Sequence, residues 1–141
     1  MTTTASEEPL GYGRAVKTNL SFAEAVDRAR AQLKEEGFGI LCDIDVAATM
    51  REKLGESFRP YRILGACNPQ LALRALSSDL GVGLLLPCNV VVREEPDGSV
   101  DVSFMDPAIM VKLTESPELR AVATQARAKL VRARDALAGA R

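Results

Sequence analysis

The sequence predicts an α+β domain in which helices pack mainly on one face of a single mixed or antiparallel sheet. Two observations predict this class: candidate strands and helices alternate through the first half of the chain, and a two-strand hairpin follows in the second half. Of the 141 residues, 47% are hydrophobic but only 4% are aromatic and none is Trp, which indicates an aliphatic core. We expect a disordered tail over residues 1–9 and a single domain over residues 10–141.

The first half of the chain contains clear helix boundaries. Ser21-Phe22-Ala23-Glu24 is a capping box, in which the serine hydroxyl and the glutamate carboxylate satisfy two free backbone N–H groups. Gly37 is the natural end of the helix that follows, and Asp45 can cap a second, shorter helix. The expected elements are a strand at 11–18, a helix to about residue 36, a strand at 38–44, a helix at 46–54 and a strand at 61–66.

The second half is predicted from two helix starts and one turn. Asn68 is expected to cap a helix whose first residue is Pro69, the position that proline favours. Residues 84–93 form an apolar run typical of a central strand, and a Pro-Asp-Gly turn joins it to a strand at 99–105. The last helix is predicted over residues 116–137. Its apolar residues recur in steps of four and three, namely Leu119, Ala123, Ala126, Leu130, Ala133 and Leu137.

Charge and composition exclude several classes of function. The 18 Lys and Arg residues nearly balance the 19 Asp and Glu residues, so a net charge of −1 argues against a dedicated nucleic-acid binder. Arg120, Arg127 and Arg134 on the last helix could form an anion-binding or nucleic-acid surface, but the near-neutral chain favours a solvated face. The chain has no histidine, which excludes Ser-His-Asp and Cys-His catalysis and removes the commonest metal ligand.

Location is predicted from three features of the sequence. The longest apolar run, residues 82–92, is interrupted by Pro87 and Asn89 and is too short to span a bilayer. The N-terminal residues are Thr-rich and acidic and lack the pattern of a secretory signal. Three cysteines, an odd number, are typical of reduced thiols. We therefore expect a soluble cytoplasmic protein with no membrane partner.

Two cysteine-asparagine pairs beside prolines are the features most suggestive of chemistry, Cys67-Asn68-Pro69 and Pro87-Cys88-Asn89. Cys67 precedes a predicted helix N-terminus, where the helix dipole favours a thiolate; the alternative is a small buried side chain. Cys88 follows a proline inside an apolar run, a pattern typical of a bulge or a strand edge. Asn89 either belongs to a site or locks a kinked strand through backbone hydrogen bonds.

Considered together, the two pairs suggest one site. Adjacent strands could bring both thiols to the same end of the sheet, where they could form a redox pair or begin a soft-metal site for Cu(I) or Zn. Zinc would need two more ligands, for which Cys42, Met105 or Asp106 are the candidates. The spacing of Cys67 and Cys88 is not a C-x-x-C motif, so the metal signal is weak.

Three further residues lie near this predicted site in the sequence. Alternation along residues 38–44 places Cys42 on the same face as Ile40 and Ile44, which predicts a core position. Tyr61 and Arg62 begin the strand that leads to Cys67. They could bind a small anion near the thiols, or they could be ordinary sheet-edge residues.

The two Cys-Asn motifs and their flanking residues resemble a known protein family. The segments Arg59-Pro60-Tyr61-Arg62-Ile63-Leu64-Gly65-Ala66-Cys67-Asn68-Pro69 and Gly83-Leu84-Leu85-Leu86-Pro87-Cys88-Asn89-Val90-Val91-Val92 are similar to those of the bacterial and archaeal family known only as domain of unknown function 302. Met105-Asp106-Pro107 also fits the pattern. The resemblance covers residues 11–137.

The resemblance implies an architecture rather than a reaction. Its members have an α+β fold similar to the TATA-binding-protein class, with a curved, mostly antiparallel sheet backed by helices, and they form homodimers. Neither DNA binding nor any assigned activity comes with that resemblance. The shared residues correspond here to Cys67, Asn68, Pro69, Pro87, Cys88, Asn89, Asp106 and Pro107.

These observations predict a homodimeric, non-catalytic module that binds a small ligand at the Cys67/Cys88 end of the sheet. No cofactor and no metal are expected, and no catalytic residue is assigned. One alternative is a redox or sulfur-transfer protein with Cys67 as nucleophile and Cys88 assisting; the others are soft-metal binding and a purely structural role. The expected ligand-binding residues are Cys67, Asn68, Cys88, Asn89, Tyr61, Arg62 and Asp106.

Overall fold

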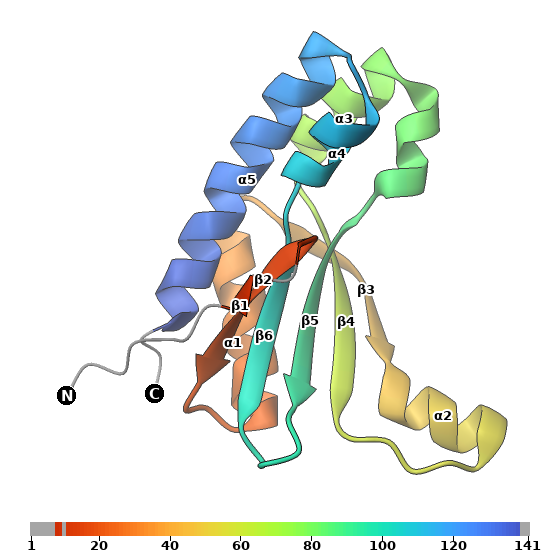
Figure 1. Ribbon diagram of the computed structural model, residues 1–141, viewed down its shortest axis with the longest axis vertical. Coiled ribbons are helices and arrows are strands. Elements are labelled where there is room, and N and C mark those ends of the chain that lie inside the picture. Colours follow the sequence, from red (N-terminus) through yellow and green to blue (C-terminus); the bar gives the residue numbers. More distant parts are fainter. Residues whose placement is uncertain (1–7, 10, 139–141) are drawn as a thin grey trace.

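The structure, a computed structural model, describes residues 8, 9 and 11–138. In this part of the chain, six antiparallel strands form one open sheet in the order β1-β2-β6-β5-β4-β3, and helices back it (Figure 1). The predicted α+β class with a mostly antiparallel sheet is therefore confirmed. The strands are β1 (Glu8–Pro9), β2 (Gly13–Thr18), β3 (Gly39–Asp45), β4 (Tyr61–Cys67), β5 (Cys88–Glu94) and β6 (Val100–Met105).

The helices occupy three positions around the sheet (Figure 1). Helices α1 and α5 lie against one face, α3 and α4 gather beyond one end together with a 3₁₀ helix, and α2 projects from the other end. The bounds are α1 (Phe22–Glu35), α2 (Val46–Leu54), α3 (Pro69–Ser78), the 3₁₀ helix η1 (Leu80–Leu85), α4 (Ala108–Leu113) and α5 (Pro117–Ala138). No helix in the described part of the chain is long and apolar enough to cross a membrane.

Local sequence signals determine the start of α1 and the buried sides of α1 and α5, the two helices that cover the sheet. The predicted capping box is present: the Ser21 hydroxyl accepts from the Glu24 backbone N–H at 3.2 Å, and the Glu24 carboxylate accepts from the Ser21 N–H at 3.4 Å. Helix α1 then buries Ala25, Val26, Ala29 and Leu33 along one side. All six apolar positions predicted for the last helix are buried in α5, together with Val122.

The buried side chains form two clusters that share α5. The larger one, the sheet core, lies between the sheet and helices α1 and α5 and includes the fully buried Leu64, Val90 and Val102. The smaller one, the end core, joins α3, η1 and α4 to the first half of α5. Its members are Leu71, Ala75, Val82, Met110, Leu119, Val122 and Ala126. The boundary between these clusters is where the two Cys-Asn motifs lie.

None of the described helices covers the other face of the sheet, which we call the open face (Figure 1). Side chains alternate along a strand, so this face carries the residues that lie between the core positions. They include the half-buried Ile63 and Val91 and the more exposed Ile44. In the pairing register, Ile44 lies opposite Ile63 and Ile63 lies opposite Val91, which makes an apolar row across three strands.

The apolar run at residues 84–93 does not form one strand, as predicted, because β5 begins only at Cys88. Residues up to Leu85 form η1 instead, where the Asp79 carboxylate accepts from the Gly81 backbone N–H at 2.9 Å and caps the turn. The Leu86–Pro87 peptide bond is cis. Because β5 begins at Cys88 and pairs with β4 in regular register, Cys88 lies at the start of a regular strand and not in a bulge.

The bulge lies in β3, and it overturns the prediction that Cys42 is in the core. Ile40 pairs with Ala66 and Cys42 with the next β4 residue, Gly65, so Leu41 is an extra residue without a partner in β4. This insertion reverses the alternation beyond it. Ile40 packs against the sheet core, whereas Cys42 is exposed on the open face.

Two other boundaries predicted from the sequence differ from those in the structure. The tail predicted for residues 1–9 overlaps β1, because Glu8 and Pro9 pair with β2; residues 1–7 lie outside the described residues. The predicted break at Met105-Asp106-Pro107 leads into α4, a short helix that is not among the elements expected from the sequence. The Asp106 carboxylate starts this helix by accepting from the Ala108 N–H at 2.9 Å.

Candidate functional site

Cys67 and Asn68 lie at the junction of β4 and α3, as predicted. Cys67 is the last residue of β4 and is half-buried. Asn68 is the N-cap of α3: its side-chain oxygen accepts from the Leu71 backbone N–H at 3.2 Å, and Pro69 is the first helical residue. The cap fixes the direction in which the chain leaves the sheet.

Cys88 lies on the neighbouring strand at the same end of the sheet. It pairs with Ala66, the residue before Cys67, so adjacent strands bring the two cysteines together. Cys88 is buried. Burial, together with a smaller effect of the nearby Cys67, raises the pKa of the Cys88 thiol to about 11. The Cys88 sulfur is therefore a protonated thiol at neutral pH.

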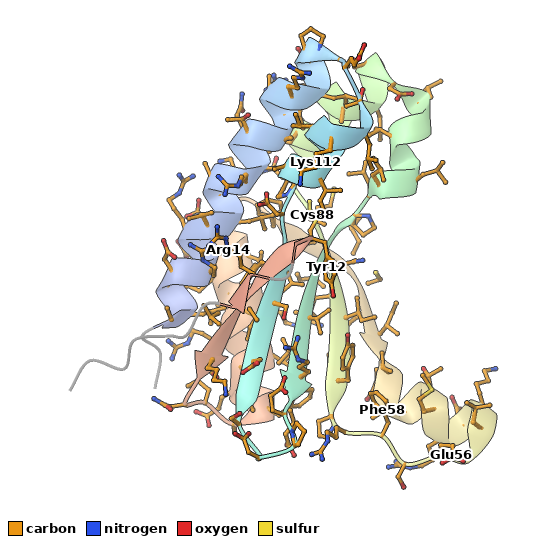
Figure 2. The ribbon with its side chains drawn as sticks, in the orientation of Figure 1. Tyr12, Arg14, Glu56, Phe58, Cys88 and Lys112 are labelled. Atoms are coloured by element: carbon orange, nitrogen blue, oxygen red, sulfur yellow. The ribbon has the colours of Figure 1, made fainter. Side chains whose placement is uncertain are left out.

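These residues line one apolar hollow between the sheet core and the end core, which we call the thiol cavity. Figure 2 shows Cys88 where the sheet meets α3 and α4. The cavity has a volume of about 30 Å³. Cys67, Asn68 and Cys88 line it together with Phe38, Leu71, Leu86, Pro87, Pro107, Met110, Val122 and five alanines: Ala66, Ala72, Ala75, Ala123 and Ala126.

Asn89 faces the other side of the sheet from Cys88. Successive side chains of a strand point to opposite faces, so Cys88 turns inward and Asn89 is exposed on the open face. There Asn89 lines a separate, shallower depression of about 290 Å³, together with Tyr12, Ser103 and Met105. The second Cys-Asn motif thus contributes to two hollows, one on each side of the sheet.

Tyr61 and Arg62 lie at the opposite end of β4 from the thiols. Tyr61 and Cys67 are the first and last of the 7 residues of β4, about 20 Å apart. The Tyr61 ring packs edge-on against Phe58, with 6.0 Å between ring centroids. Arg62 donates to the carboxylate of Asp43. The prediction that this phenol and guanidinium adjoin the thiols is therefore wrong.

Asp106 stabilises the end of the sheet but lies outside the thiol cavity. Besides accepting from the Ala108 N–H in the turn before α4, its carboxylate accepts from Arg127 Nε at 3.1 Å and 3.3 Å. With Arg14, Arg127 and Arg134 it lines a small separate hollow beside α5. Its neighbour Pro107 reaches the thiol cavity. The contacts of Asp106 are those of a turn and an ion pair.

The arrangement does not favour the soft-metal alternative. Cys88 is buried beneath the sheet, whereas Cys42 is exposed on the open face, so the sheet separates these two potential ligands. Among the described residues, no group of three or more Cys, Asp or Glu side chains is arranged to hold a metal ion.

Fold and site together define a small α+β protein with an open antiparallel sheet and an alanine- and thiol-lined cavity at one end. The family described as "Domain of unknown function DUF302" matches residues 14–137, and the chain belongs to this family. It is also similar to a solved structure, the crystal structure of an uncharacterized conserved DUF302 protein from Bacillus stearothermophilus. The identity is 33%, the TM-score is 0.81, and the match covers 89% of this chain and 98% of that one. No curated protein matches the chain.

Sequence reasoning missed the alanines of the cavity and most of the open-face depression. The signal for the first was present: Ala72 and Ala75 on one helix and Ala123 and Ala126 on another are spaced three apart, so each pair shares a helix face. That the two pairs line the same hollow depends on how α3 packs against α5, which local sequence does not encode.

Proposed function

We propose that the protein is a homodimeric, non-catalytic module that binds a small uncharged ligand in the thiol cavity. The supporting observation is the void itself, because protein interiors are normally filled to crystal-like density. Five alanines leave this space at the boundary of two packed cores. An unfilled apolar void costs stability through lost contacts, so its presence at the family's Cys-Asn motifs favours a role in binding.

The chemistry of the cavity wall supports a neutral, apolar ligand group. With its pKa raised to about 11, Cys88 offers a weak S–H donor rather than a thiolate. The remaining wall is almost entirely aliphatic. A volume of about 30 Å³ holds roughly two water-sized groups, which corresponds to a short alkyl or thioalkyl group, alone or at the tip of a larger molecule. Thiol exchange is less well supported, because Cys88 is both protonated and buried.

Filling the cavity tests this proposal. Ala72 lies half-buried at its wall, so Ala72→Leu should occupy the void with little strain on the fold. Ala128→Leu is the matched control, because Ala128 is exposed on α5 and does not line the cavity. Xenon and a series of short thioethers are suitable probes, since dry apolar cavities bind xenon and small apolar molecules.

We expect xenon to shift the NMR signals of the cavity residues, and a short thioether to raise the melting temperature. Both effects should persist in Ala128→Leu and disappear in Ala72→Leu. Wild-type protein that responds to none of these probes would count against the ligand-binding proposal.

The homodimer is proposed to form through α2 and the neighbouring edge of the sheet. Within the described part of the chain, none of the nine residues of α2 is buried, although an isolated helix of this length is marginal in water. Figure 1 shows this helix projecting away from the body of the protein. Large apolar side chains are exposed on this helix and on the segments on either side of it in the chain: Leu41 in β3 by 70%, Leu54 at the end of α2 by 67% and Phe58 after α2 by 47%. An exposed apolar surface of this kind is typical of a protein–protein interface.

The interface is tested by placing charge on it. Leu54→Asp should convert a dimer into a monomer, measured by light scattering behind size-exclusion chromatography. Leu80→Asp is the control, because Leu80 is equally large and 87% exposed but lies on η1, at the other end of the molecule. A wild-type monomer, or a Leu54→Asp dimer, would contradict this proposal.

A further inference from the structure

We propose that the depression on the open face is a second binding site, which takes a neutral aromatic molecule carrying a carbonyl oxygen. This open-face groove is lined by Tyr12, Asn89, Val91, Ser103, Met105 and Ile109, with backbone from Gly13 and Phe104. Its volume of about 290 Å³ approaches the lower limit of ordinary small-molecule sites, about 300 Å³. The inference does not depend on the thiol cavity, which lies on the other side of the sheet.

The floor of the groove is built by three neighbouring strands in a fixed register. Val91 pairs with Ser103 and Gly13 with Met105, so alternate residues of β5, β6 and β2 share this face. A Cβ atom at Gly13 would overlap the Phe104 carbonyl oxygen. The strands therefore approach closely at this point, and the floor here is bare main chain.

The walls suit a flat apolar body. Val91, Met105 and Ile109 supply aliphatic and thioether surface from two strands and α4. Tyr12, 65% exposed, supplies an aromatic ring at the end of β2 nearest α4 (Figure 2). An aromatic ligand could stack on this ring or meet its edge.

Ser103 determines the polar group that the ligand needs. Only 9% of Ser103 is exposed, and its hydroxyl oxygen accepts from Arg93 Nη1 at 2.7 Å. Among the described residues, its hydroxyl hydrogen has no acceptor. The hydroxyl group faces the groove, where a ligand carbonyl oxygen would accept a hydrogen bond from it.

The surrounding charges favour a neutral ligand over an anion. Arg93 is the nearest cation to Ser103, but its Nε donates to Glu95 at 2.5 Å and its Nη2 to Asp101 at 3.4 Å. Its charge is therefore already balanced. Arg93 acts as a positioning residue, which holds the Ser103 oxygen so that the hydroxyl hydrogen remains available. At the rim, the exposed amide of Asn89 can donate and accept, which suits the second polar group of a carboxamide.

The test compares three probes of one shape: benzamide, benzoate and ethylbenzene. Each is titrated into the protein and followed by the NMR shifts of backbone amides in β5 and β6. We expect benzamide to bind saturably, and benzoate and ethylbenzene to bind at least tenfold more weakly. Ser103→Ala should weaken benzamide binding about tenfold, the equivalent of one hydrogen bond. Ser78→Ala, an exposed serine on α3, should leave it unchanged.

Two further variants keep the proposal falsifiable. Val91→Phe should fill the groove without touching the Arg93 contacts and abolish benzamide binding, whereas Ala72→Leu, which fills the thiol cavity, should not affect it. Equal binding of benzamide and ethylbenzene would overturn the inference that the ligand carries a carbonyl oxygen. No saturable shift in the wild type would overturn the site. The proposal would also be overturned if the backbone amides of the groove are shielded from solvent only in the dimer. A second copy of the chain would then be the occupant.

Discussion

The sulfur of Cys42 lies directly over Gly65, only 2.5 Å from the position that a Cβ atom at Gly65 would take. The Pro87 ring approaches the same position to 2.9 Å. Position 65 is thus the point where β3, β4 and the segment before β5 meet on the open face, and only a residue without a side chain fits there. The bulge at Leu41 produces this contact, because it turns Cys42 toward the open face.

Replacing Gly65 with alanine should destabilise the protein by about 2 kcal/mol, the usual cost of overpacking. The cause is steric, so removing the opposing sulfur should relieve part of it. We expect the double variant Gly65→Ala/Cys42→Ala to be more stable than the sum of the two single changes predicts, in urea unfolding. Strict additivity of the two effects would show that the sulfur is not the obstacle.

Cys42 and Cys88 should differ sharply in alkylation by iodoacetamide. Cys42 is exposed and should react first, whereas Cys88 is buried and protonated. With a pKa of about 11, roughly one Cys88 thiol in a thousand is ionised at pH 8, and that fraction rises about tenfold per pH unit until the pKa is reached. Peptide mass spectrometry follows each site separately. Cys88 modification as fast as that of Cys42 in folded protein would contradict the burial of this thiol.

Much of the fold could be predicted because its signals are local. The Ser21 capping box, the Asn68 cap before Pro69 and the stripe of α5 each depend on residues within a few positions of one another. Two features could not be predicted in this way. An apolar run has no periodicity to separate a strand from a helix, so the sequence predicts a single strand over residues 84–93. The bulge at Leu41 depends on the pairing with β4, which is a tertiary contact.

The residues of the candidate site could be predicted only where the connections between strands and helices determine their positions. Cys67 and Cys88 were expected to meet because they lie at the junctions of strands that can pair, and they do lie at one end of the sheet. The length of β4 separates Tyr61 and Arg62 from them, and strand alternation turns Asn89 to the other face. These three placements follow from pairing register rather than from proximity in the sequence.

Asp43 should give the protein part of its stability above acidic pH. A hydrogen bond from Arg62 lowers the pKa of the Asp43 carboxyl below 3.8, and Arg30 lowers it further, while burial opposes both effects. Because the folded-state pKa is lowered, this stability is present above pH 3.8 and is lost as the pH falls through the folded-state pKa. Asp43→Asn should therefore cost about 1–2 kcal/mol near neutral pH, since both arginines are partly exposed.

Urea unfolding as a function of pH measures this contribution. The difference between wild type and Asp43→Asn should shrink as the carboxyl becomes protonated. Glu35→Gln, at an exposed position near the end of α1, should have little effect at any pH. A constant difference between wild type and Asp43→Asn across the acid range would contradict the role of ionisation.

Asp101 shows the opposite behaviour, and its removal should stabilise the protein at neutral pH. It is 4% exposed, and its Oδ1 has no hydrogen-bond partner among the described residues. Burial raises the pKa of the Asp101 carboxyl above 3.8, and the charge of Glu95 raises it further, against the opposing effect of Arg93. For a raised pKa, the stability is complete below pH 3.8 and is lost as the pH rises through the folded-state pKa.

Asp101→Asn removes this ionisation while keeping an oxygen that can accept from Arg93. We expect the variant to gain about 1 kcal/mol over wild type at neutral pH and to lose the advantage below about pH 4, where the wild-type carboxyl is protonated. Urea unfolding at both pH values measures the change. If Asp101→Asn is less stable than wild type at neutral pH, the ionised carboxylate is stabilised by Arg93 more than it is penalised by burial, and the assignment of Asp101 as an unfavourable buried acid is wrong.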